Sequence, residues 1–146
     1  MKTWKVKTLG ELKEVARAVL ALFEKQKKND QAVLCLHGEL GSGKTAFTKE
    51  LAKLLKVKET VNSPTFVIMK IYQAKNQFRH LVHIDAYRIE TIDEMRVLGF
   101  ESLLKEKNTI ICIEWAERIK EFLPRDAWHL NFSLDNNERH LSLTYD

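Results

Sequence analysis

Residues 38–45 read Gly38-Glu39-Leu40-Gly41-Ser42-Gly43-Lys44-Thr45 and match the pattern G-x-x-x-x-G-K-S/T at every fixed position. The apolar run 32–36 precedes this stretch, and apolar residues at helical spacing follow it as far as Leu55. A strand, a glycine-rich turn and a helix in this order are the context in which the pattern indicates a phosphate-binding loop. A chance match is rare in a chain of this length, so we interpret 38–45 as such a loop.

The residues of this loop have definite physical roles. Glycines let the backbone curl until several N–H groups point at one phosphate, and the start of the helix adds partial positive charge. Lys44 can reach the β- and γ-phosphates of a nucleotide, and the Thr45 hydroxyl can ligate Mg²⁺. We therefore predict that residues 39–45 bind a nucleotide and its Mg²⁺, and that Lys44 takes part in catalysis.

Size and composition narrow the class of protein. The 146 residues suffice for one domain with a core but hardly for two, so a single domain over 1–146 is predicted. The net charge of +4 permits contact with nucleic acid or an acidic partner without arguing for either. No apolar stretch approaches the roughly 18 residues that span a membrane. The N-terminus lacks a signal-peptide core, and we expect a cytoplasmic protein. Cys35 and Cys112 lie within apolar runs and are predicted to be reduced core thiols.

Hydrophobic periodicity predicts alternating strands and helices in the first half of the chain and antiparallel strands later. Strands are predicted over 4–7, 32–37, 66–72, 78–85, 110–113, 128–134 and 139–144, and helices over 12–23, 46–55 and 92–104, the last with a candidate break at Gly99. The third strand pairs with the fourth, and the sixth with the seventh, as hairpins. The basic segment 25–30 is predicted to be a solvated loop, with RNA contact as the alternative. An α/β fold with a mixed, partly antiparallel sheet flanked by helices fits best.

Two carboxylates are candidates for the second half of a nucleotide site, because hydrolysis requires acidic groups near the metal. Glu114 follows the apolar run 110–113, which is typical of a buried central strand, and is the predicted metal ligand. Asp85 ends the apolar run 81–84 and is predicted to bind Mg²⁺ through water or to orient the attacking water. The alternatives are a surface ion pair for Glu114 and a cap or turn for Asp85.

The segment Ser63-Pro64-Thr65-Phe66 follows the helix of the phosphate loop. Pro64 stiffens it and biases Ser63 away from helical geometry. Thr65 can meet the metal or the γ-phosphate, as switch threonines do. A rigid turn without a ligand role is an equal alternative on physical grounds.

Four motifs together resemble the TsaE family: Gly-Glu-Leu-Gly-Ser-Gly-Lys-Thr at 38–45, Ser-Pro-Thr-Phe at 63–66, His-Ile-Asp-Ala-Tyr-Arg at 83–88 and Ile-Glu-Trp at 113–115. The resemblance runs from about Leu12 to Leu143 in the family's order and spacing. It implies a small bacterial ATPase with ATP and Mg²⁺ as cofactors. Such an ATPase is needed to make threonylcarbamoyladenosine in tRNA beside the anticodon, and it acts with the partners TsaB and TsaD. Any contact with tRNA is expected to be shared with those partners.

The resemblance also assigns roles to residues. Lys44 would contact phosphate, Thr45 and Glu114 would hold Mg²⁺, and Asp85 would be the catalytic carboxylate. Thr65 would belong to a switch segment, Trp115 would lie beside the metal carboxylate, and Arg139 matches an arginine of the family's last hairpin. The N-terminus departs from the family because Leu12-Lys13-Glu14-Val15-Ala16 lacks the usual Thr and Gly. Thr8 is a weaker candidate for a contact with the base.

Other side chains near the motifs have two interpretations each. His83 shares a strand face with Asp85 and either touches the site or orients that carboxylate, with a hydrogen-bonded structural histidine as an equal alternative. Tyr87 is interpreted as core packing, and Arg88 as either a charge contact or a surface ion pair. His37 receives no role.

Two other functions use the same loop. A small-molecule kinase usually needs an arginine-rich lid, and the arginines here are scattered. A GTPase normally carries Asn-Lys-x-Asp, which is missing, and this favours adenine over guanine. No arginine is evident from the sequence as a finger over the γ-phosphate, a group that can contribute about 10³–10⁵ in rate. Slow turnover in the absence of partners is therefore expected.

Overall fold

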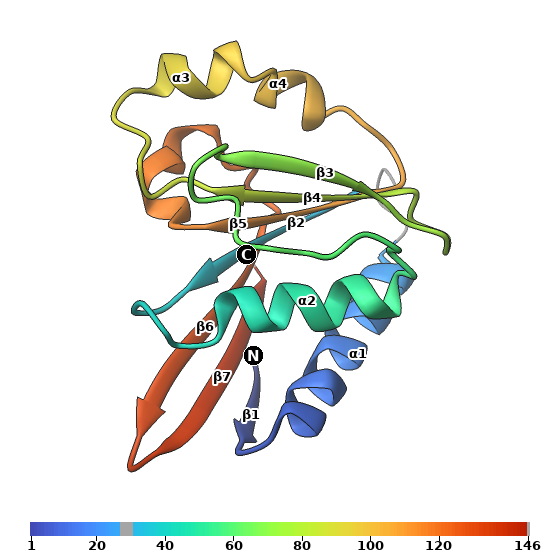
Figure 1. Cartoon of the computed structure of the whole chain (residues 1–146), viewed down its shortest axis with the longest axis vertical. Coiled ribbons are helices and arrows are strands. Elements are labelled where there is room, and N and C mark those ends of the chain that lie inside the picture. Colours follow the sequence, from blue (N-terminus) through green and yellow to red (C-terminus); the bar gives the residue numbers. More distant parts are fainter. Residues whose placement is uncertain (27–30, 146) are drawn as a thin grey trace.

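A seven-stranded mixed sheet runs through the computed structural model, which describes residues 1–26 and 31–145 (Figure 1). The strand order is β1-β7-β6-β2-β5-β4-β3. The strands are β1 Lys2–Val6, β2 Gln31–His37, β3 Met69–Gln73, β4 His80–Asp85, β5 Thr109–Glu114, β6 Trp128–Asp135 and β7 Glu138–Tyr145. The helices are α1 Leu9–Lys25, α2 Lys44–Leu54, α3 Ile92–Val97, α4 Phe100–Leu103 and the 3₁₀ helix η1 Ala116–Phe122. The predicted α/β fold class is confirmed.

Parallel pairing is confined to the centre of the sheet. β2 lies between β5 and β6 and is parallel to both, and β4 is parallel to β5. The two edges are antiparallel, with β3 on β4, and β7 between β6 and β1. Both predicted hairpins are confirmed. Central strands are covered on both faces, which explains the continuous apolar runs of β2 and β5. The carboxyl ends of β2, β4 and β5 meet at one edge.

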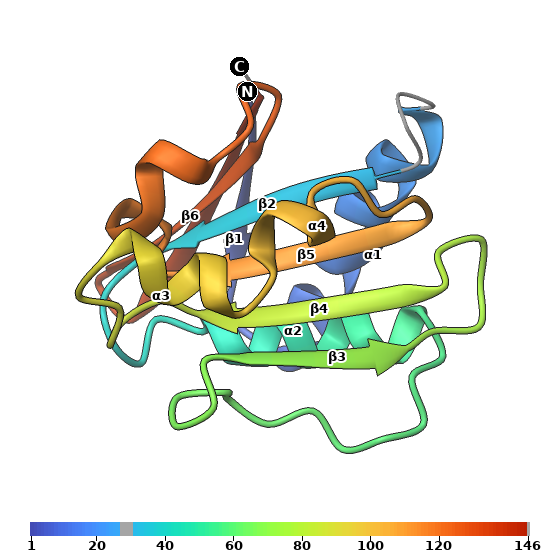
Figure 2. The ribbon, with the colours of Figure 1, turned by 90° about the horizontal axis from the view of Figure 1, so that it is seen from above.

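Strand alternation divides the core into two layers. Leu34 and Leu36 of β2 face the layer that α1 and α2 cover, whereas Val33 and Cys35 face the layer of α3, α4 and η1. Figures 1 and 2 show these helices on opposite sides of the sheet. No helix among the described residues combines the length and apolar character that crossing a bilayer requires.

The first helix begins earlier than its hydrophobic pattern suggests. Thr8 is the N-cap of α1, and its hydroxyl accepts a hydrogen bond of 3.2 Å from the Glu11 N–H. The Glu11 carboxylate in turn accepts from the Lys7 N–H at 2.6 Å, so donors on both sides of the cap are satisfied. The segment 25–30, predicted as a loop, contributes Lys25 to the end of α1, and its residues 27–30 lie outside the described part of the chain.

The strand predicted over 66–72 is wrong in its first half, since β3 begins only at Met69. The Ile68 N–H donates to the Pro64 carbonyl at 2.6 Å, and Ile68 adopts a left-handed φ of 69°. Residues 65–67 therefore form a turn, and Phe66 is 85% exposed at its surface. A turn closed by its own backbone overrides the β propensity of Phe66, Val67 and Ile68.

The predicted break at Gly99 is confirmed, and one further element differs from the prediction. The helix predicted over 92–104 is divided into α3 and α4, because Gly99 takes a left-handed φ of 79°. The helix η1 was not predicted; it follows β5 directly and carries few apolar residues at helical spacing.

The two cysteines are buried and free, as predicted for core thiols. Burial, with a smaller contribution from the nearby Glu117 carboxylate, raises the pKa of the Cys35 thiol to about 12. Burial also raises the pKa of Cys112. Both side chains are therefore thiols at neutral pH.

Candidate functional site

The phosphate loop connects β2 to α2 at the edge where the parallel strands end. Asp85 ends β4, Glu114 ends β5, and the two residues are direct neighbours in the β4–β5 pairing. Alternation places both side chains on the α2 face of the sheet. The fold thus brings together the phosphate loop and two carboxylates that lie about 40 and 70 positions after it in the chain.

Glycine is required at two positions of the loop for different reasons. A Cβ on Gly38 would lie 2.6 Å from Ser42 Oγ and 2.9 Å from the Phe132 carbonyl oxygen, so there is no room for a side chain. Gly43 takes a φ of 111°, a conformation that L-residues rarely adopt, immediately before the first residue of α2. These constraints hold the loop close to Phe132 of β6 and turn its backbone toward the start of α2.

Lys44 is a buried cation, only 5% exposed. Its ammonium group donates to the Gly38 carbonyl and lies 4.3 Å from the centre of the Trp115 ring. It forms no ion pair within residues 1–26 and 31–145. The Ser42 hydroxyl, in the same loop, is buried without a hydrogen-bond partner among the described residues. A buried cation and a buried donor that both lack an anionic partner fit a bound phosphate.

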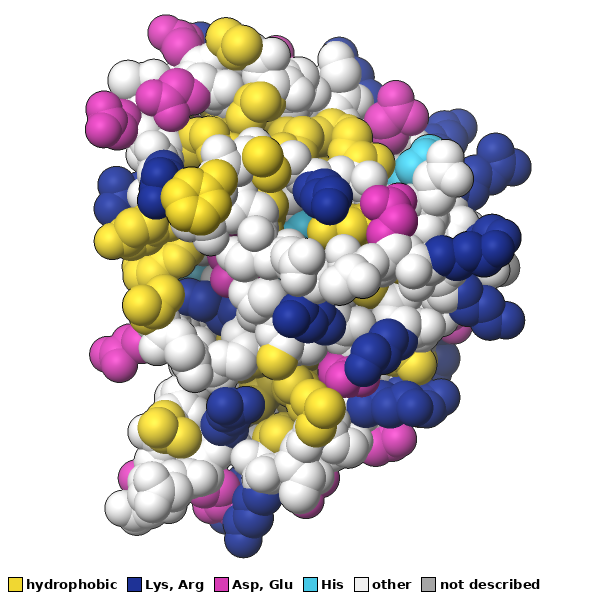
Figure 3. All heavy atoms as spheres, viewed as in Figure 1, with side chains coloured by type: hydrophobic (Ala, Val, Ile, Leu, Met, Phe, Trp, Pro, Cys, Tyr) yellow, Lys and Arg dark blue, Asp and Glu magenta, His cyan; other side chains and the backbone are white. Residues whose placement is uncertain are grey.

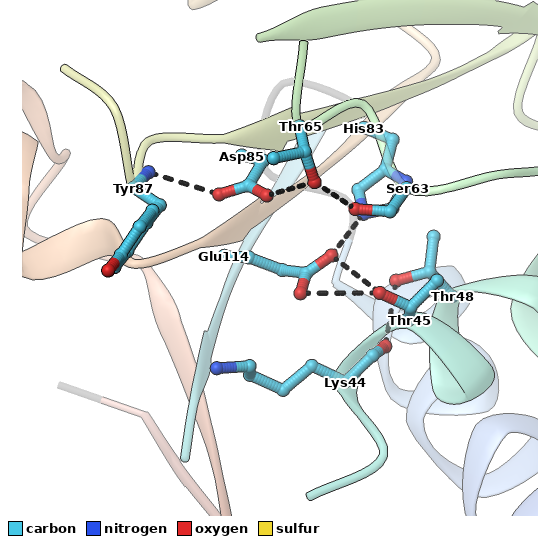
Figure 4. A network of polar contacts seen from close by, with 9 residues as sticks. All are labelled: Lys44, Thr45, Thr48, Ser63, Thr65, His83, Asp85, Tyr87 and Glu114. Atoms are coloured by element: carbon cyan, nitrogen blue, oxygen red, sulfur yellow. Dashed lines mark hydrogen bonds and ion pairs between the residues drawn. The ribbon is translucent and has the colours of Figure 1, made fainter. Parts of the chain in front are cut away.

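Thr45 and Glu114 meet as the sequence predicted. The Thr45 hydroxyl lies 3.2 and 3.4 Å from the two carboxylate oxygens of Glu114 (Figure 4). His83 Nε2 lies 2.6 Å from Glu114 Oε2. His83 therefore touches the site through Glu114, and the orienting contact with Asp85 that was the other possibility is not formed. Because His83 is fully buried, it holds the Glu114 carboxylate in place toward Thr45.

Asp85 and Thr65 form the opposite side of the site. The Thr65 hydroxyl donates to Asp85 Oδ2 at 3.1 Å and lies 2.8 Å from the Ser63 hydroxyl (Figure 4). The Tyr87 N–H donates to Asp85 Oδ1 at 3.0 Å. The segment 63–66 thus leads into the turn at 65–67, and its threonine points at the Asp85 carboxylate, while a contact of Thr65 with metal or γ-phosphate stays a prediction.

One pocket of about 320 Å³ joins these groups; it is lined by Lys44, Thr45, Ser63, Thr65, Asp85 and Glu114, together with Leu40, Gly41, Gly43, Ala46, Trp115 and Arg139. Arg139 extends from β7, and its Nη1 lies 3.3 Å from the point that a Cβ on Gly43 would occupy. Arg139, which the resemblance matched to the family's last hairpin, thus borders the phosphate loop, although no arginine was evident from the sequence as a finger over the γ-phosphate. No sequence spacing could reveal this contact, since 94 positions separate Arg139 from Thr45 and only the sheet brings them together.

Thr8 lies outside this pocket. Its side chain caps α1, and it lines a neighbouring pocket of about 300 Å³ that also includes Arg139. The two pockets share Arg139 at their boundary. Thr8 therefore has a structural role that accounts for its position, while its predicted contact with the base stays a prediction.

Two aromatic residues of the site were interpreted incompletely from the sequence. Tyr87, expected in the core, is half-exposed and packs against Trp115 with ring centres 4.9 Å apart. Trp115 adopts a left-handed φ of 58° directly after Glu114, and this conformation turns its ring over Lys44. The left-handed backbone of Trp115 indicates a functional position, because such a conformation is unfavourable for a non-glycine residue and is retained mainly at functional sites. It is visible in the structure and not in the sequence.

The donor set suits Mg²⁺. Mg²⁺ prefers hard oxygen ligands, usually one or two carboxylates with hydroxyl, phosphate and water oxygens. The Thr45 hydroxyl and Glu114 carboxylate supply such oxygens, with the Asp85 carboxylate in the same pocket. No soft ligand is present among the residues that line it.

Comparison with known proteins gives a consistent result. The model of the family "Threonylcarbamoyl adenosine biosynthesis protein TsaE" matches residues 6–141. The tRNA threonylcarbamoyladenosine biosynthesis protein TsaE of Rickettsia typhi is 38% identical over 138 residues, covering 93% of this chain and 92% of that protein. The TsaE protein of Bacillus subtilis is 35% identical over 142 residues, covering 97% and 84%.

A solved structure agrees with these relatives. The crystal structure of YdiB from Bacillus subtilis superposes with a TM-score of 0.73 at 28% identity, covering 99% of this chain and 84% of that one. The family match extends over every residue of the pocket just described. From the motifs, the fold and these relatives, we conclude that the chain belongs to the TsaE family.

Proposed function

We propose that this protein binds and hydrolyses ATP with Mg²⁺ in the cytoplasm, in support of the threonylcarbamoyl modification of adenosine beside the tRNA anticodon. It acts as a nucleotide-dependent switch with the TsaB–TsaD complex. The observation that carries the proposal is the buried Lys44, which has no ion-pair partner among the described residues, in a phosphate loop whose Thr45 faces Glu114. The relatives' part in threonylcarbamoyladenosine biosynthesis supports the biological setting.

In this proposal the phosphate loop binds the phosphates of the nucleotide, and Thr45 and Glu114 bind the metal ion. Backbone N–H groups of 39–45 and the Lys44 ammonium bind the β- and γ-phosphates. Thr45 and Glu114 hold Mg²⁺, with His83 fixing the orientation of Glu114. When bound, Mg²⁺ supplies charge neutralisation of the phosphate oxygens.

Asp85 and Thr65 act at the γ-phosphate end. Asp85 orients the attacking water, and its hydrogen bond with Thr65 links this carboxylate to the 63–66 turn. A γ-phosphate that draws the Thr65 hydroxyl away would break that bond and move the turn. Phe66 and Val67 project from the same turn and are exposed, so its movement changes the surface of the protein.

Exposed apolar side chains are candidates for the partner-facing surface. Leu40 in the phosphate loop, Phe66 and Val67 in the turn and Tyr87 after β4 are all exposed close to residues that line the pocket. Figure 3 shows hydrophobic side chains gathered at the left edge of the molecule, the side on which the loop between β2 and α2 lies in Figure 1. The affinity of a partner that binds there would then depend on which nucleotide is bound.

Partner binding and ATPase rate together test the switch. Calorimetry of the TsaB–TsaD pair with this protein should give affinities that differ about 5–150-fold between an ATP analogue and ADP, the usual range for coupled sites. The pair should also accelerate the ATPase, and multiple-turnover tRNA modification should fail with Lys44→Ala. Equal affinity with ATP analogue, with ADP and without nucleotide, and no rate stimulation, would leave only a nucleotide-binding scaffold.

Arg139 is expected to stabilise negative charge on the phosphates from within the chain. It forms no ion pair within the described residues, and its guanidinium group borders the loop. Arg139→Ala should lower kcat about 10- to 150-fold, the equivalent of one charge-assisted hydrogen bond. Arg139→Lys should recover part of the loss. Arg125→Ala, at an exposed position after η1, is the matched control. Unchanged turnover in Arg139→Ala would exclude this role.

A further inference from the structure

A second cluster of chemically reactive side chains lies on the other face of the sheet. Cys35 and His37 are two positions apart on β2, and His129 of β6 is the direct strand partner of Cys35. Alternation therefore points all three side chains into the layer that η1 covers, away from α2, Thr45 and Glu114. The nucleotide site described above uses none of these three residues.

The three side chains converge on one point. One donor atom from each, the Cys35 sulfur and a ring nitrogen of each histidine, lies within 4.8 Å of the other two. His37 Nε2 and His129 Nδ1 are 2.9 Å apart, and the two rings stack with centres 5.1 Å apart. Among the described residues, no other group of three cysteine, histidine or acidic side chains is drawn together in this way.

The Glu117 carboxylate lies next to His37, on the ring nitrogen that points away from His129. Glu117 Oε2, from η1, lies 3.6 Å from His37 Nδ1. This leaves His37 Nε2 directed toward His129. A carboxylate on the outer nitrogen of an imidazole is the usual support for a metal-binding histidine, because it fixes the ring and raises its basicity.

From this geometry we propose that Cys35, His37 and His129 form a binding site for a borderline-soft divalent metal ion, Zn²⁺ in particular. One thiolate and two imidazoles are ligands that Zn²⁺ prefers and that Mg²⁺ does not. The Cys35 thiol releases its proton to solvent as the sulfur–metal bond forms. Both histidines are only half-buried, so solvent can reach a fourth coordination position. The site is distinct from the Mg²⁺ ligands and does not depend on the proposed ATPase function.

The position of this cluster links it to the phosphate loop. His37 is the last residue of β2 and immediately precedes Gly38, whose carbonyl accepts the hydrogen bond of Lys44. Glu117 lies two residues after Trp115, whose ring covers Lys44. A metal ion at the cluster would thus fix both segments that hold the Lys44 ammonium.

The alternative to a metal site is a purely structural pair of packed histidines beside a core thiol. Cobalt binding distinguishes these two interpretations. Co²⁺ bound to a thiolate gives an intense near-ultraviolet charge-transfer absorption, which Co²⁺ on oxygen ligands does not. We expect one Co²⁺ per chain with this absorption in the wild-type protein, displaced by Zn²⁺ and not by Mg²⁺. Absence of the absorption, or displacement by Mg²⁺, would overturn the proposal.

Variants identify the ligands. Cys35→Ala and His129→Gln should each abolish the absorption, and Glu117→Gln should weaken Zn²⁺ binding about 10- to 100-fold. His140→Gln is the matched control, because His140 also faces a glutamate, Glu138 at 3.6 Å, but has no thiol in its cluster. His129 is half-buried, so His129→Gln keeps the test valid should the core variant Cys35→Ala fail to fold. Zn²⁺ affinity unchanged in His129→Gln would refute the site.

Discussion

Replacing Lys44 with alanine is expected to abolish ATP hydrolysis and to weaken ATP binding. The Lys44 ammonium is buried, forms no ion pair among the described residues, and is held by the Gly38 carbonyl and the Trp115 ring. Charge-assisted hydrogen bonds are worth about 1.5–3 kcal/mol each. Loss of contacts to both the β- and γ-phosphates therefore corresponds to about 10²–10⁴ in rate.

The measurement is steady-state hydrolysis of ATP with and without the partner proteins, alongside calorimetric binding of ATP. Lys44→Met retains the apolar stem against Trp115 and separates lost charge from lost packing. Lys49→Ala, on the exposed side of the same helix, is the matched control and should leave kcat unchanged. Near-wild-type turnover in Lys44→Ala would mean that 38–45 is not the catalytic phosphate loop.

Glu114→Ala and Asp85→Ala are expected to damage the site in different ways. Glu114 contacts Thr45 and His83, and its loss should remove a metal ligand and lower activity about 10²–10⁴-fold, since metal stabilisation is worth several kcal/mol. Asp85 contacts Thr65 and the Tyr87 N–H, and its loss should lower turnover more than nucleotide affinity. ATP affinity measured with and without Mg²⁺ for each variant distinguishes the two effects.

Each variant has a control that keeps the shape of the side chain. Glu114→Gln and Asp85→Asn retain the shape of the side chain while removing the charge and replacing one acceptor oxygen by an NH₂ donor. Both native side chains are almost fully buried, so folding of each variant should be checked by thermal unfolding before its kinetics are interpreted. Magnesium dependence that stays unchanged in Glu114→Ala would exclude Glu114 as a ligand and make Asp85 the better candidate.

Hydrophobic patterns within a few residues correctly predicted the strands and helices whose formation depends on local propensity and burial. The apolar runs of β2 and β5 fit central strands only, and the fixed residues of 38–45 have roles that short-range geometry explains. Glu114 and Asp85 were identifiable for the same reason, because each ends a buried strand of the parallel part of the sheet. The strand predicted from β propensity over 66–68 was wrong, because the hydrogen bond from the Ile68 N–H to the Pro64 carbonyl closes a turn there.

The sequence by itself therefore determined the phosphate loop, the two acidic strand ends and the alternation of strands and helices, since these depend on neighbours within a few residues. Only the tertiary structure decided which side chains meet. It placed His83 on Glu114, Thr65 on Asp85, and Arg139 beside Gly43. It also gathered Cys35, His37 and His129 on the opposite face. These contacts follow from strand order and register, which depend on the packing of the whole chain and leave no signal in local spacing.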